Sequence, residues 1–490
     1  MSIIAVIFVV ISSALALVLP WLGVLAYYLF SIMQMQYLWP QDFGLGRVQL
    51  MLSGATFLGL ALATALKQVD WNRILTPVSL LMVLLVILVN LSLHFTGFKF
   101  YVDPMTDLEM PGLLTQDRVL DSFNKALIFY FMASLLIDSR KKLLCCIYVL
   151  GVVTLFYSLW ANKIYVTGEF WRFGENGRLG GPLGSLYLDE NALAMMFILA
   201  TPILYYLGVG QKLWFIRYSM WFFIPLTWHA VFLTGSRGAL VSLGVCCVYI
   251  FFRSFNRTAS ICMAVGLVLA VVFQGGQLLT RVDDTVATAD GTEYVTDEYL
   301  ERYGAKAIDP RVISWTVATE IMREFPLFGV GVGNFINAFP RYSNTNPHVA
   351  HNTYFQLSAN CGIGAGLIYL WMFARRLPTL KGSADIDGTR NFARGFKRDY
   401  LDDLLNSLAL AFFVVALFLD LMTYDILYFI LLMSFCKYNL DRAPPPKKHK
   451  LIDSIYRHVK SNREQKVENQ APSLAQERYR TSGNSHLSSR

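Results

Sequence analysis

The sequence predicts an all-α polytopic membrane protein with about 12–13 transmembrane helices and one large loop outside the cytoplasm. Three observations lead to this fold class. Of the 490 residues, 55% are hydrophobic, 14% are aromatic and only 16% are charged, with a mean hydropathy of +0.45. Apolar runs long enough to cross a bilayer recur along the chain, and basic residues collect in alternate connections between them. This composition leaves no room for a large soluble domain.

The apolar runs define the expected helices, because a spanning helix needs roughly 20 largely apolar residues. The first run, Ile3 to Leu19, has no basic residue before it and no small-residue cleavage site, so we expect a retained helix and not a cleaved signal peptide. Only Pro20 separates it from the second run, which leaves the side of the N-terminus open. The candidate spans lie near 3–19, 21–39, 48–66, 74–96, 122–137, 143–161, 191–208, 214–233, 238–252, 258–274, 353–373, 404–420 and 421–438.

Basic connections orient these helices, because Lys and Arg concentrate in cytoplasmic loops. They contain Lys67 and Arg73, then Arg140 to Lys142, then Lys212 and Arg217, then Arg253 and Arg257, and finally Arg375 to Arg398. All of them fall on one side, which is therefore predicted to be cytoplasmic. The predicted parts are helices 1–10 in residues 1–274, a large periplasmic loop with an amphipathic helix in 275–352, helices 11–13 with a basic cytoplasmic loop in 353–440, and a cytoplasmic tail in 441–490.

The tail is polar and basic, with eleven Lys and Arg against five Asp and Glu, or +6 of the net charge of +8. We expect it to be disordered. A basic segment beside a membrane more often marks the cytoplasmic side near anionic lipid than a nucleic-acid site, so the expected partners include membrane lipid and no nucleic acid. The seven cysteines lie in apolar runs or at their ends without metal-ligand spacing, so neither a disulfide framework nor a zinc site is expected.

The predicted outer loops contain the unusual polar residues of the chain. The stretch "WRFGENGRLGGPLGSLYLDENALAMMF" has Arg172 and Arg178 in a glycine-rich segment. The same stretch has Asp189, Glu190 and Asn191 at the start of a helix. Taken alone, Asp189 or Asn191 is explained as a helix cap, since short polar side chains accept hydrogen bonds from the first free backbone N–H groups.

Two further stretches add to this set. "LTGSRGALVSL" has Arg237 just inside the outer end of a helix, a position where arginines usually extend toward lipid phosphates. "DPRVISWTVATEIMREFPLFGVGVGN" predicts a helix capped by Asp309, with Pro310 first and Arg311 in the first turn. Its apolar residues recur at helical spacing, so we expect it along the membrane surface. We interpret "GVGVGN" as a turn, because no strand precedes it as in a phosphate-binding loop.

The stretch "PHVAHNTYFQLSANCGIGAGLIYLWMF" has His351 and Asn352 at the mouth of an apolar run. His351 alone is commonly an interfacial histidine without a catalytic role. His348 and His351 share a helical face as metal ligands do, but no acidic or cysteine partner lies nearby in the sequence, so no metal site is expected. Asn352 either orients His351 or caps the helix, and we favour the cap.

The convergence of these residues indicates a chemistry. Four arginines, an acidic pair and a histidine map to one predicted side of the membrane. Arginine's planar fork binds phosphate oxygens in pairs and keeps its charge, so it suits a diphosphate leaving group. A neutral histidine can accept the proton of an attacking hydroxyl. The pattern therefore predicts glycosyl or phosphoryl-type transfer from a phosphate-activated donor.

The same stretches carry a family resemblance. "GPLGSLYLDENALAMMFILATPILYYL", "TGSRGALVSL", "DPRVISWTVATEIMREFPLFGVGVGNF" and "AHNTYFQLSANCGIGAGL" resemble, in this order, the successive blocks of the O-antigen ligase and Wzy polymerase superfamily. The stretches "GVLAYYLFSIMQMQYLWP" and "GGPLGSLYLDENALA" are most similar to its O-glycosylation ligase branch associated with exosortase systems. The resemblance covers about residues 20 to 375.

The resemblance implies an enzyme of the bacterial inner membrane that takes a glycan from an undecaprenyl-diphosphate donor in the periplasm and needs no metal or other cofactor. Direct displacement at the anomeric carbon would invert its configuration. The acceptor would be a hydroxyl of a glycan, a lipid or a protein. His351 and Arg237 are implied as catalytic residues, and Arg172, Arg178 and Arg311 as ligands of the donor diphosphate. The expected supporting residues are Asp189, Glu190, Asn191 and Asn352.

Two alternatives stay open at this point. A Wzy-type polymerase uses the same donor and differs only in its acceptor, and the resemblance to the exosortase-associated branch favours a ligase. A transporter or flippase of a lipid-linked or anionic substrate also needs arginines and many helices. Such proteins often show repeated halves and buried ionisable groups at mid-membrane, whereas this sequence shows no internal repeat and no Asp or Glu near the centres of expected helices three to eleven.

Overall fold

A computed structural model of the chain describes residues 3–43, 47–98, 116–174, 177–254, 256–258, 260–265, 267–268, 310–374 and 400–442. Residues Met1–Tyr438 form one compact unit, and Asn439–Arg490 form a second unit whose described part is the end of the last helix. The predicted cap Asp309, the basic loop and nearly all of the predicted tail lie outside the described residues.

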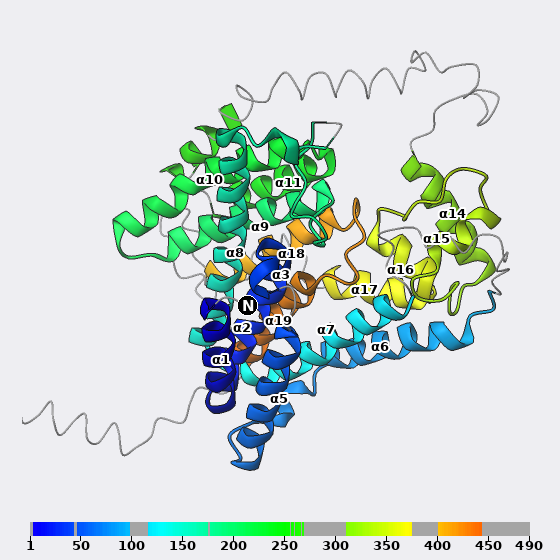
Figure 1. The fold of residues 1–490 in the computed structure, drawn as a ribbon, viewed down its shortest axis with the longest axis horizontal. Coiled ribbons are helices and arrows are strands. Elements are labelled where there is room, and N and C mark those ends of the chain that lie inside the picture. Colours follow the sequence, from blue (N-terminus) through cyan, green and yellow to red (C-terminus); the bar gives the residue numbers. More distant parts are fainter. Residues whose placement is uncertain are drawn as a thin grey trace, which may run out of the picture. The chain divides into compact units, whose positions relative to one another are not determined.

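The regular elements of the described residues are all helical, apart from one isolated bridge between Phe173 and Leu179 (Figure 1). Five of their helices are long and apolar enough to cross a membrane. They are α5 (Val48–Ala65), α6 (Pro77–Phe95), α7 (Gln116–Leu136) over residues Val119–Leu136, α8 (Arg140–Thr167) and α9 (Glu190–Gly210). The all-α membrane fold class is thus confirmed, whereas the total of 12–13 spans stays a prediction.

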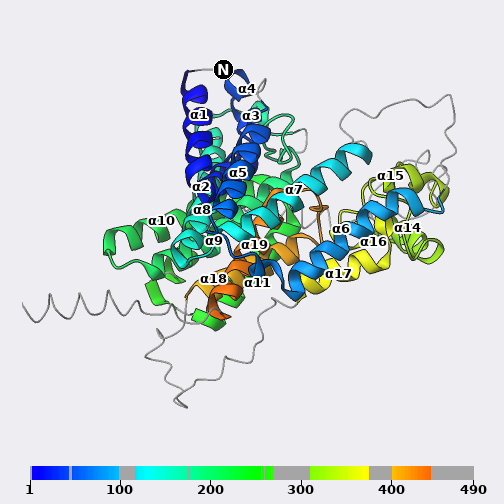
Figure 2. The ribbon, with the colours of Figure 1, turned by 90° about the horizontal axis from the view of Figure 1, so that it is seen from below.

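The first two apolar runs form an antiparallel hairpin. Helices α1 (Ile3–Val18) and α2 (Pro20–Met33) reverse at Leu19, and α3 (Met35–Leu38) and α4 (Pro40–Phe43) follow. Phe8 and Phe30 both contact Phe43, with ring centroids 6.3 and 5.6 Å apart. Since a straight helix would separate Phe8 from Phe30 by about 33 Å, the reversal is required. The start of α1 therefore lies beside α4, as Figure 2 also shows.

Helix α9 is the most deeply buried long helix, with every residue from Ala192 to Gly208 buried. It packs against α8, α10 (Trp214–Thr234), α11 (Arg237–Ser254) and α18 (Tyr400–Val415). The indole N–H groups of Trp221 and Trp228 donate to Tyr205 O and Thr201 Oγ1, both at 3.1 Å, and so attach α10 to α9. Apolar residues around the whole circumference are expected of a helix enclosed by others.

The ends that are predicted to be cytoplasmic meet through ion pairs and aromatic contacts. Arg253 Nε lies 2.8 Å from the buried Asp403 carboxylate, which joins the end of α11 to the start of α18. Lys437 of α19 (Asp425–Arg442) lies 2.9 Å from Asp402. Lys142 at the start of α8 lies 5.9 Å from the ring centroid of Trp21. The ion pairs bring the end of α11, the start of α18 and α19 together, and the cytoplasmic side of the basic connections stays a prediction.

The predicted helix 353–373 is wrong in its continuity, because it breaks into α16 (Thr353–Cys361) and α17 (Ile363–Ala374) at Gly362. Gly362 has φ +91°, and a Cβ there would lie 2.0 Å from the carbonyl oxygen of Leu327. The backbone N–H of Ile363 donates to Pro326 O at 2.9 Å. The loop after α14 (Pro310–Glu324) therefore inserts at the break, where only glycine allows this approach.

The glycine-rich stretch "GVGVGN" is a turn, as predicted. Gly329, Gly331 and Gly333 have positive φ, and the N–H groups of Val330 and Gly331 donate to Ala359 O and Asn360 O at 3.0 and 2.9 Å. These are carbonyl groups at the end of α16 that have no partner within the helix. The turn caps α16, so these two N–H groups are not available to a phosphate.

Helix α14 forms as predicted, but its apolar face does not rest on the membrane surface. Val317, Ala318 and Ile321 are buried in a core shared with Phe98, α15 (Phe335–Ala338) and Ala359 of α16. Trp315 stacks on Phe355, with ring centroids 6.0 Å apart. Since this core uses the apolar face, the membrane-surface interpretation was wrong. The face holds the described part of the large loop against α16.

We expect the substitution Gly362→Ala to destabilise the protein by at least about 3 kcal/mol, because it adds a methyl group at a glycine-only conformation against Leu327 O. Gly364→Ala, two residues later in α17, is the matched control. A Cβ at Gly364 meets only Leu88 at 3.8 Å, and alanine favours helix by about 1 kcal/mol. The measurement is the midpoint of thermal unfolding in detergent. Equal midpoints for the two variants would contradict the inserted-loop geometry.

Candidate functional site

The connection between α18 and α19, residues 416–424, holds the segment that follows His351 and Asn352. The Thr353 N–H donates to Ala416 O at 2.8 Å, and its hydroxyl donates to Leu419 O at 2.6 Å. The same hydroxyl accepts from Leu421 N at 3.0 Å. Three hydrogen bonds from one buried residue therefore fix the start of α16 on this connection.

Two other predicted site segments reach the same connection. The backbone at Gly238, next to Arg237, lies so close to Phe418 that a Cβ there would be 2.7 Å from the ring. The Tyr424 hydroxyl donates to Leu186 O at 2.8 Å, in the loop before α9. Segments near residues 186, 238 and 353 therefore converge on one nine-residue connection. We expected one helix to end at 420 and the next to begin at 421, which was wrong because α18 ends at Val415 and α19 begins at Asp425. The stretch between them contacts three neighbouring segments through backbone and side-chain groups.

Arg178 holds the loop before α9 through hydrogen bonds and an ion pair. Its Nε donates to Thr234 O at 2.9 Å, Nη2 donates to Asn191 Oδ1 at 3.1 Å, and Nη1 lies 3.6 Å from Glu190 Oε2. Leu179 N also donates to Leu233 O at 3.0 Å. The guanidinium thus joins the end of α10 to the start of α9, which favours a positioning role for Arg178 over the expected diphosphate contact.

The two acidic residues Asp189 and Glu190 make different contacts. Asp189 is the N-cap of α9, because its Oδ1 accepts from Asn191 N at 2.8 Å and from Ala192 N at 3.0 Å. Glu190 pairs with Arg178, so only one acid of the pair meets an arginine there. These contacts orient α9 at the end where the predicted outer loops meet.

Arg237 is the first residue of α11 and is exposed. The preceding Gly235 ends α10 in the left-handed conformation with φ +57°. The Ser236 hydroxyl accepts from Ala239 N at 3.2 Å and so caps α11. This tight junction joins α10 to α11, and the exposed Arg237 directly precedes Gly238, whose backbone approaches Phe418 of the 416–424 connection.

His351 has an unusual backbone conformation, with φ +46°. Its neighbours are fixed on both sides. Ala350 accepts from Trp315 Nε1 at 2.8 Å and donates to Gln356 Oε1 at 2.7 Å. Asn352 caps α16 by accepting from Tyr354 N and Phe355 N at 3.0 and 3.2 Å, so the preferred cap assignment is confirmed. A non-glycine residue held at positive φ by its surroundings is typical of functional sites.

Residues 221–370 match the family model described as O-antigen ligase. The match begins in α10, includes Arg237, Arg311, His351 and Asn352, and ends in α17. This match supports the resemblance of the chain to the O-antigen ligase and Wzy superfamily over residues 221–370. No curated protein matches the chain. Assignment to the exosortase-associated branch stays a prediction.

Several expected site residues lie outside the matched O-antigen ligase domain, and the structure locates them independently. Glu190 and Asn191 are joined to the domain through Arg178, which donates to Thr234 O, and Asp189 caps the same helix start. Arg172 is held elsewhere on the same loop, by Glu169 at 3.1 Å and over the Trp171 ring at 4.3 Å. No described contact brings Arg172 to the 416–424 connection, which weakens its expected role in diphosphate binding.

Arg311 lies within the O-antigen ligase domain and is half-buried. It precedes Trp315 by one helical turn on α14, so the two side chains share a face. Trp315 bonds the residue before His351. Of the expected diphosphate ligands, Arg311 is thus the one whose helix is directly attached to the histidine segment.

Asp420 is a candidate that the sequence interpretation missed. It lies in the 416–424 connection, is partly buried, and its Oδ1 accepts from Met422 N at 3.3 Å. Burial raises the pKa of its carboxyl to about 6. The sequence signal was an acid inside the apolar run "ALFLDLMTY", which we assigned to the end of a spanning helix. A buried carboxyl with a perturbed pKa, beside the other predicted site segments, is a functional candidate.

The raised pKa of Asp420 gives a pH-dependent prediction. The folded protein holds this proton more tightly than the unfolded chain, so the stabilisation is present below about pH 4 and is lost as pH rises through about 6. Asp420→Asn cannot ionise and avoids this loss. We expect its thermal midpoint to rise relative to wild type between about pH 4 and about pH 7, by the equivalent of about 1–3 kcal/mol. A pH-independent difference would contradict the prediction.

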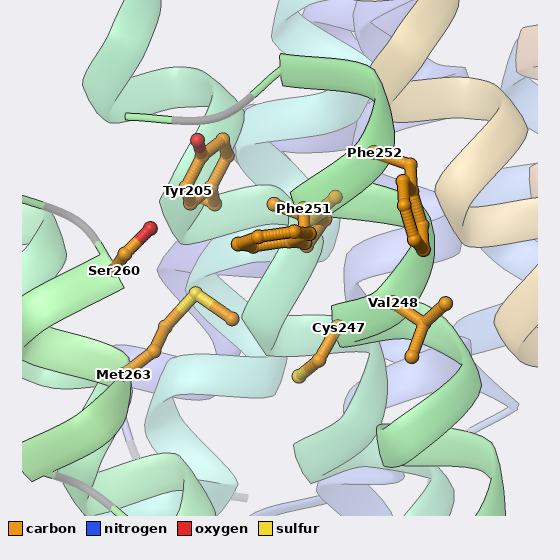
Figure 3. Close-up of a pocket in the computed structure, with 8 residues that line it drawn as sticks. Tyr205, Cys247, Val248, Phe251, Phe252, Ser260 and Met263 are labelled. Carbon is orange, nitrogen blue, oxygen red and sulfur yellow. The ribbon is translucent and has the colours of Figure 1, made fainter. Parts of the chain in front are cut away.

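The described residues contain no group of three His, Cys, Asp or Glu side chains arranged to hold a metal ion. A cavity of about 380 Å³ lies between α9, α11 and residues 260–263 (Figure 3). On α11 its lining begins at Cys247, about 15 Å beyond Arg237 along the helix. This cavity is separate from the candidate site.

Proposed function

We propose that the protein transfers a glycan from an undecaprenyl-diphosphate donor to an acceptor hydroxyl in the periplasm of a bacterium. The observation that carries this proposal is the convergence of the Arg237, His351 and pre-α9 segments on the 416–424 connection. The O-antigen ligase domain supports a lipid-linked glycan as the class of substrate. The polyprenyl chain would stay in the lipid while the acceptor arrives from the aqueous side.

In the proposed reaction, Arg237 and Arg311 bind the donor diphosphate. The neutral His351 accepts the proton of the acceptor hydroxyl, whose oxygen forms a bond to the anomeric carbon. The bond from that carbon to the diphosphate oxygen breaks, and undecaprenyl diphosphate leaves with the electron pair. The arginines stabilise the negative charge that grows on this leaving group. Direct displacement inverts the anomeric configuration, so a product with retained configuration would exclude the mechanism.

The protein's scaffold explains why these groups would be ready to react. Arg178, Asp189 and Asn191 fix the start of α9, and Asn352 and Thr353 fix the start of α16. At each helix start, a side chain accepts hydrogen bonds from the first backbone N–H groups, without any substrate. The geometry is thus set by folding, which lowers the reorganisation needed in the transition state.

The acceptor is tested by comparing glycan from cells with and without the protein on gels. We expect cells without it to lose acceptor-linked glycan and accumulate long lipid-linked chains, as a ligase requires. Chains reduced to single repeat units would instead identify a polymerase that uses the same donor. If the profile is unchanged, transfer is rejected and transport of a lipid-linked substrate becomes the better explanation.

A further inference from the structure

The apolar cavity between α9 and α11 has a lining that suits a hydrocarbon chain. Val248, Phe251 and Phe252 of α11 form one wall, with Met263 opposite them (Figure 3). Tyr205 of α9 closes one end. Its volume of about 380 Å³ is within the range of ligand cavities, about 300–1,000 Å³.

A second, smaller cavity of about 190 Å³ is lined in part by neighbouring residues of the same segments. It is lined by Val209, Arg217, Trp221 and Asn256. Val209 lies one helical turn beyond Tyr205 on α9, and Asn256 lies one turn before Ser260, whose N–H donates to Asn256 O at 2.8 Å. The linings of the two cavities are therefore one helical turn apart on α9 and at residues 256–260.

The smaller cavity adds a cation to this apolar space. Arg217 Nε donates to Gln211 O at 3.2 Å, and Nη2 bonds the same carbonyl, which fixes the guanidinium group at the start of α10. Arg257 is exposed nearby in sequence, in a connection that is predicted to be cytoplasmic. Trp214, Phe215 and Tyr218 are exposed in the first turns of α10. Exposed aromatic residues are enriched where a helix meets the membrane–water interface.

We propose that the two cavities together bind one anionic phospholipid, with an acyl chain in the larger cavity and the phosphate at Arg217. Basic pockets between membrane helices on the cytoplasmic side are suited to anionic headgroups. The site is distinct from the transfer site, because Arg217 lies seventeen residues, or about 25 Å, along α10 from Thr234, which Arg178 bonds. The proposal does not depend on the proposed function.

The test is native mass spectrometry of the full chain purified in mild detergent, followed by extraction of the retained lipid. We expect phosphatidylglycerol or another anionic phospholipid at one molecule per chain. Arg217→Ala should lower the retained fraction about fivefold, the effect of one basic residue near a headgroup, and Arg217→Lys should keep most of it. Lys212→Ala is the matched control, because Lys212 is exposed and lines neither cavity.

A second variant tests the acyl-chain half of the site. Cys247→Phe adds bulk to the larger cavity and leaves Arg217 intact, so we expect it to abolish retention. Adding phosphatidylglycerol to delipidated wild type should raise its thermal midpoint, whereas phosphatidylcholine should not. The proposal would be overturned if wild type retained phosphatidylglycerol and phosphatidylcholine equally. It would also be overturned if Arg217→Ala and Cys247→Phe both retained as much lipid as wild type.

Discussion

The substitution His351→Ala is expected to lower the rate of glycan transfer by about 10²–10⁴-fold, the usual contribution of a general base. The physical reason is that the acceptor hydroxyl keeps its proton as its oxygen approaches the anomeric carbon. Because His351 is placed by backbone bonds of Ala350 and by the Asn352 cap, its removal should leave the fold intact. The measurement is kcat with a purified lipid-linked donor and acceptor, in protein matched for thermal midpoint.

His348→Ala is the control for this prediction. His348 is the same residue type three positions earlier and is exposed. We expect its variant to keep the wild-type kcat, which would separate a base from a general effect of charge or hydration near α16. The assignment of His351 as the base fails if both variants lose activity equally, or if His351→Ala raises KM alone.

The sequence was sufficient for the elements that depend on local patterns. Helices at 48–65, 77–95 and 214–234 were expected within three residues of their ends, because apolar composition and flanking charges decide where such helices begin. The caps Asp189 and Asn352 followed from the preference of short polar side chains for helix starts. The turn at residues 329–334 followed from its glycines.

The remaining features depend on contacts between segments far apart in the chain. The helix breaks at Gly362, where the backbone of Leu327 approaches it. The residues around Gly362 do not predict this contact with a distant segment. The 416–424 connection is held by Thr353, which is distant in sequence and whose N–H and hydroxyl donate to two of its carbonyl groups. An apolar stretch looks the same in sequence whether lipid or protein surrounds it, which is why the apolar face of α14 was misassigned to the membrane surface.

The candidate site was foreseen as a set of residues but not as an arrangement. Arg178 was expected at the diphosphate, yet Thr234, Asn191 and Glu190 engage its three nitrogens. Asp420 was not recognised as a site residue, because the apolar residues around it were assigned to the end of a spanning helix. In both cases the chemistry of the side chain was plain from the sequence, whereas its partners depend on the tertiary fold.

The substitution Arg237→Ala is expected to lower kcat by about 10²–10³-fold, the loss that follows removal of one donor to a developing negative charge. Arg237 is exposed at the start of α11, so alanine should cost little stability. Arg237→Lys keeps the charge but replaces the two-pronged fork by a point charge. Its activity should recover only in part, because a diphosphate oxygen pair needs both N–H groups at fixed spacing. Steady-state kinetics with the purified donor measure both variants.

The lysine variant decides between the two roles open to Arg237. If Arg237 only extends toward lipid phosphates, a flexible ammonium group serves equally well, and Arg237→Lys would match wild type in kcat. If Arg237 stabilises the leaving diphosphate, the lysine variant stays well below wild type while KM changes little, because the contact strengthens in the transition state. Arg323→Ala is the matched control: Arg323 pairs with Glu320 on exposed α14 surface, so its loss should leave both constants unchanged.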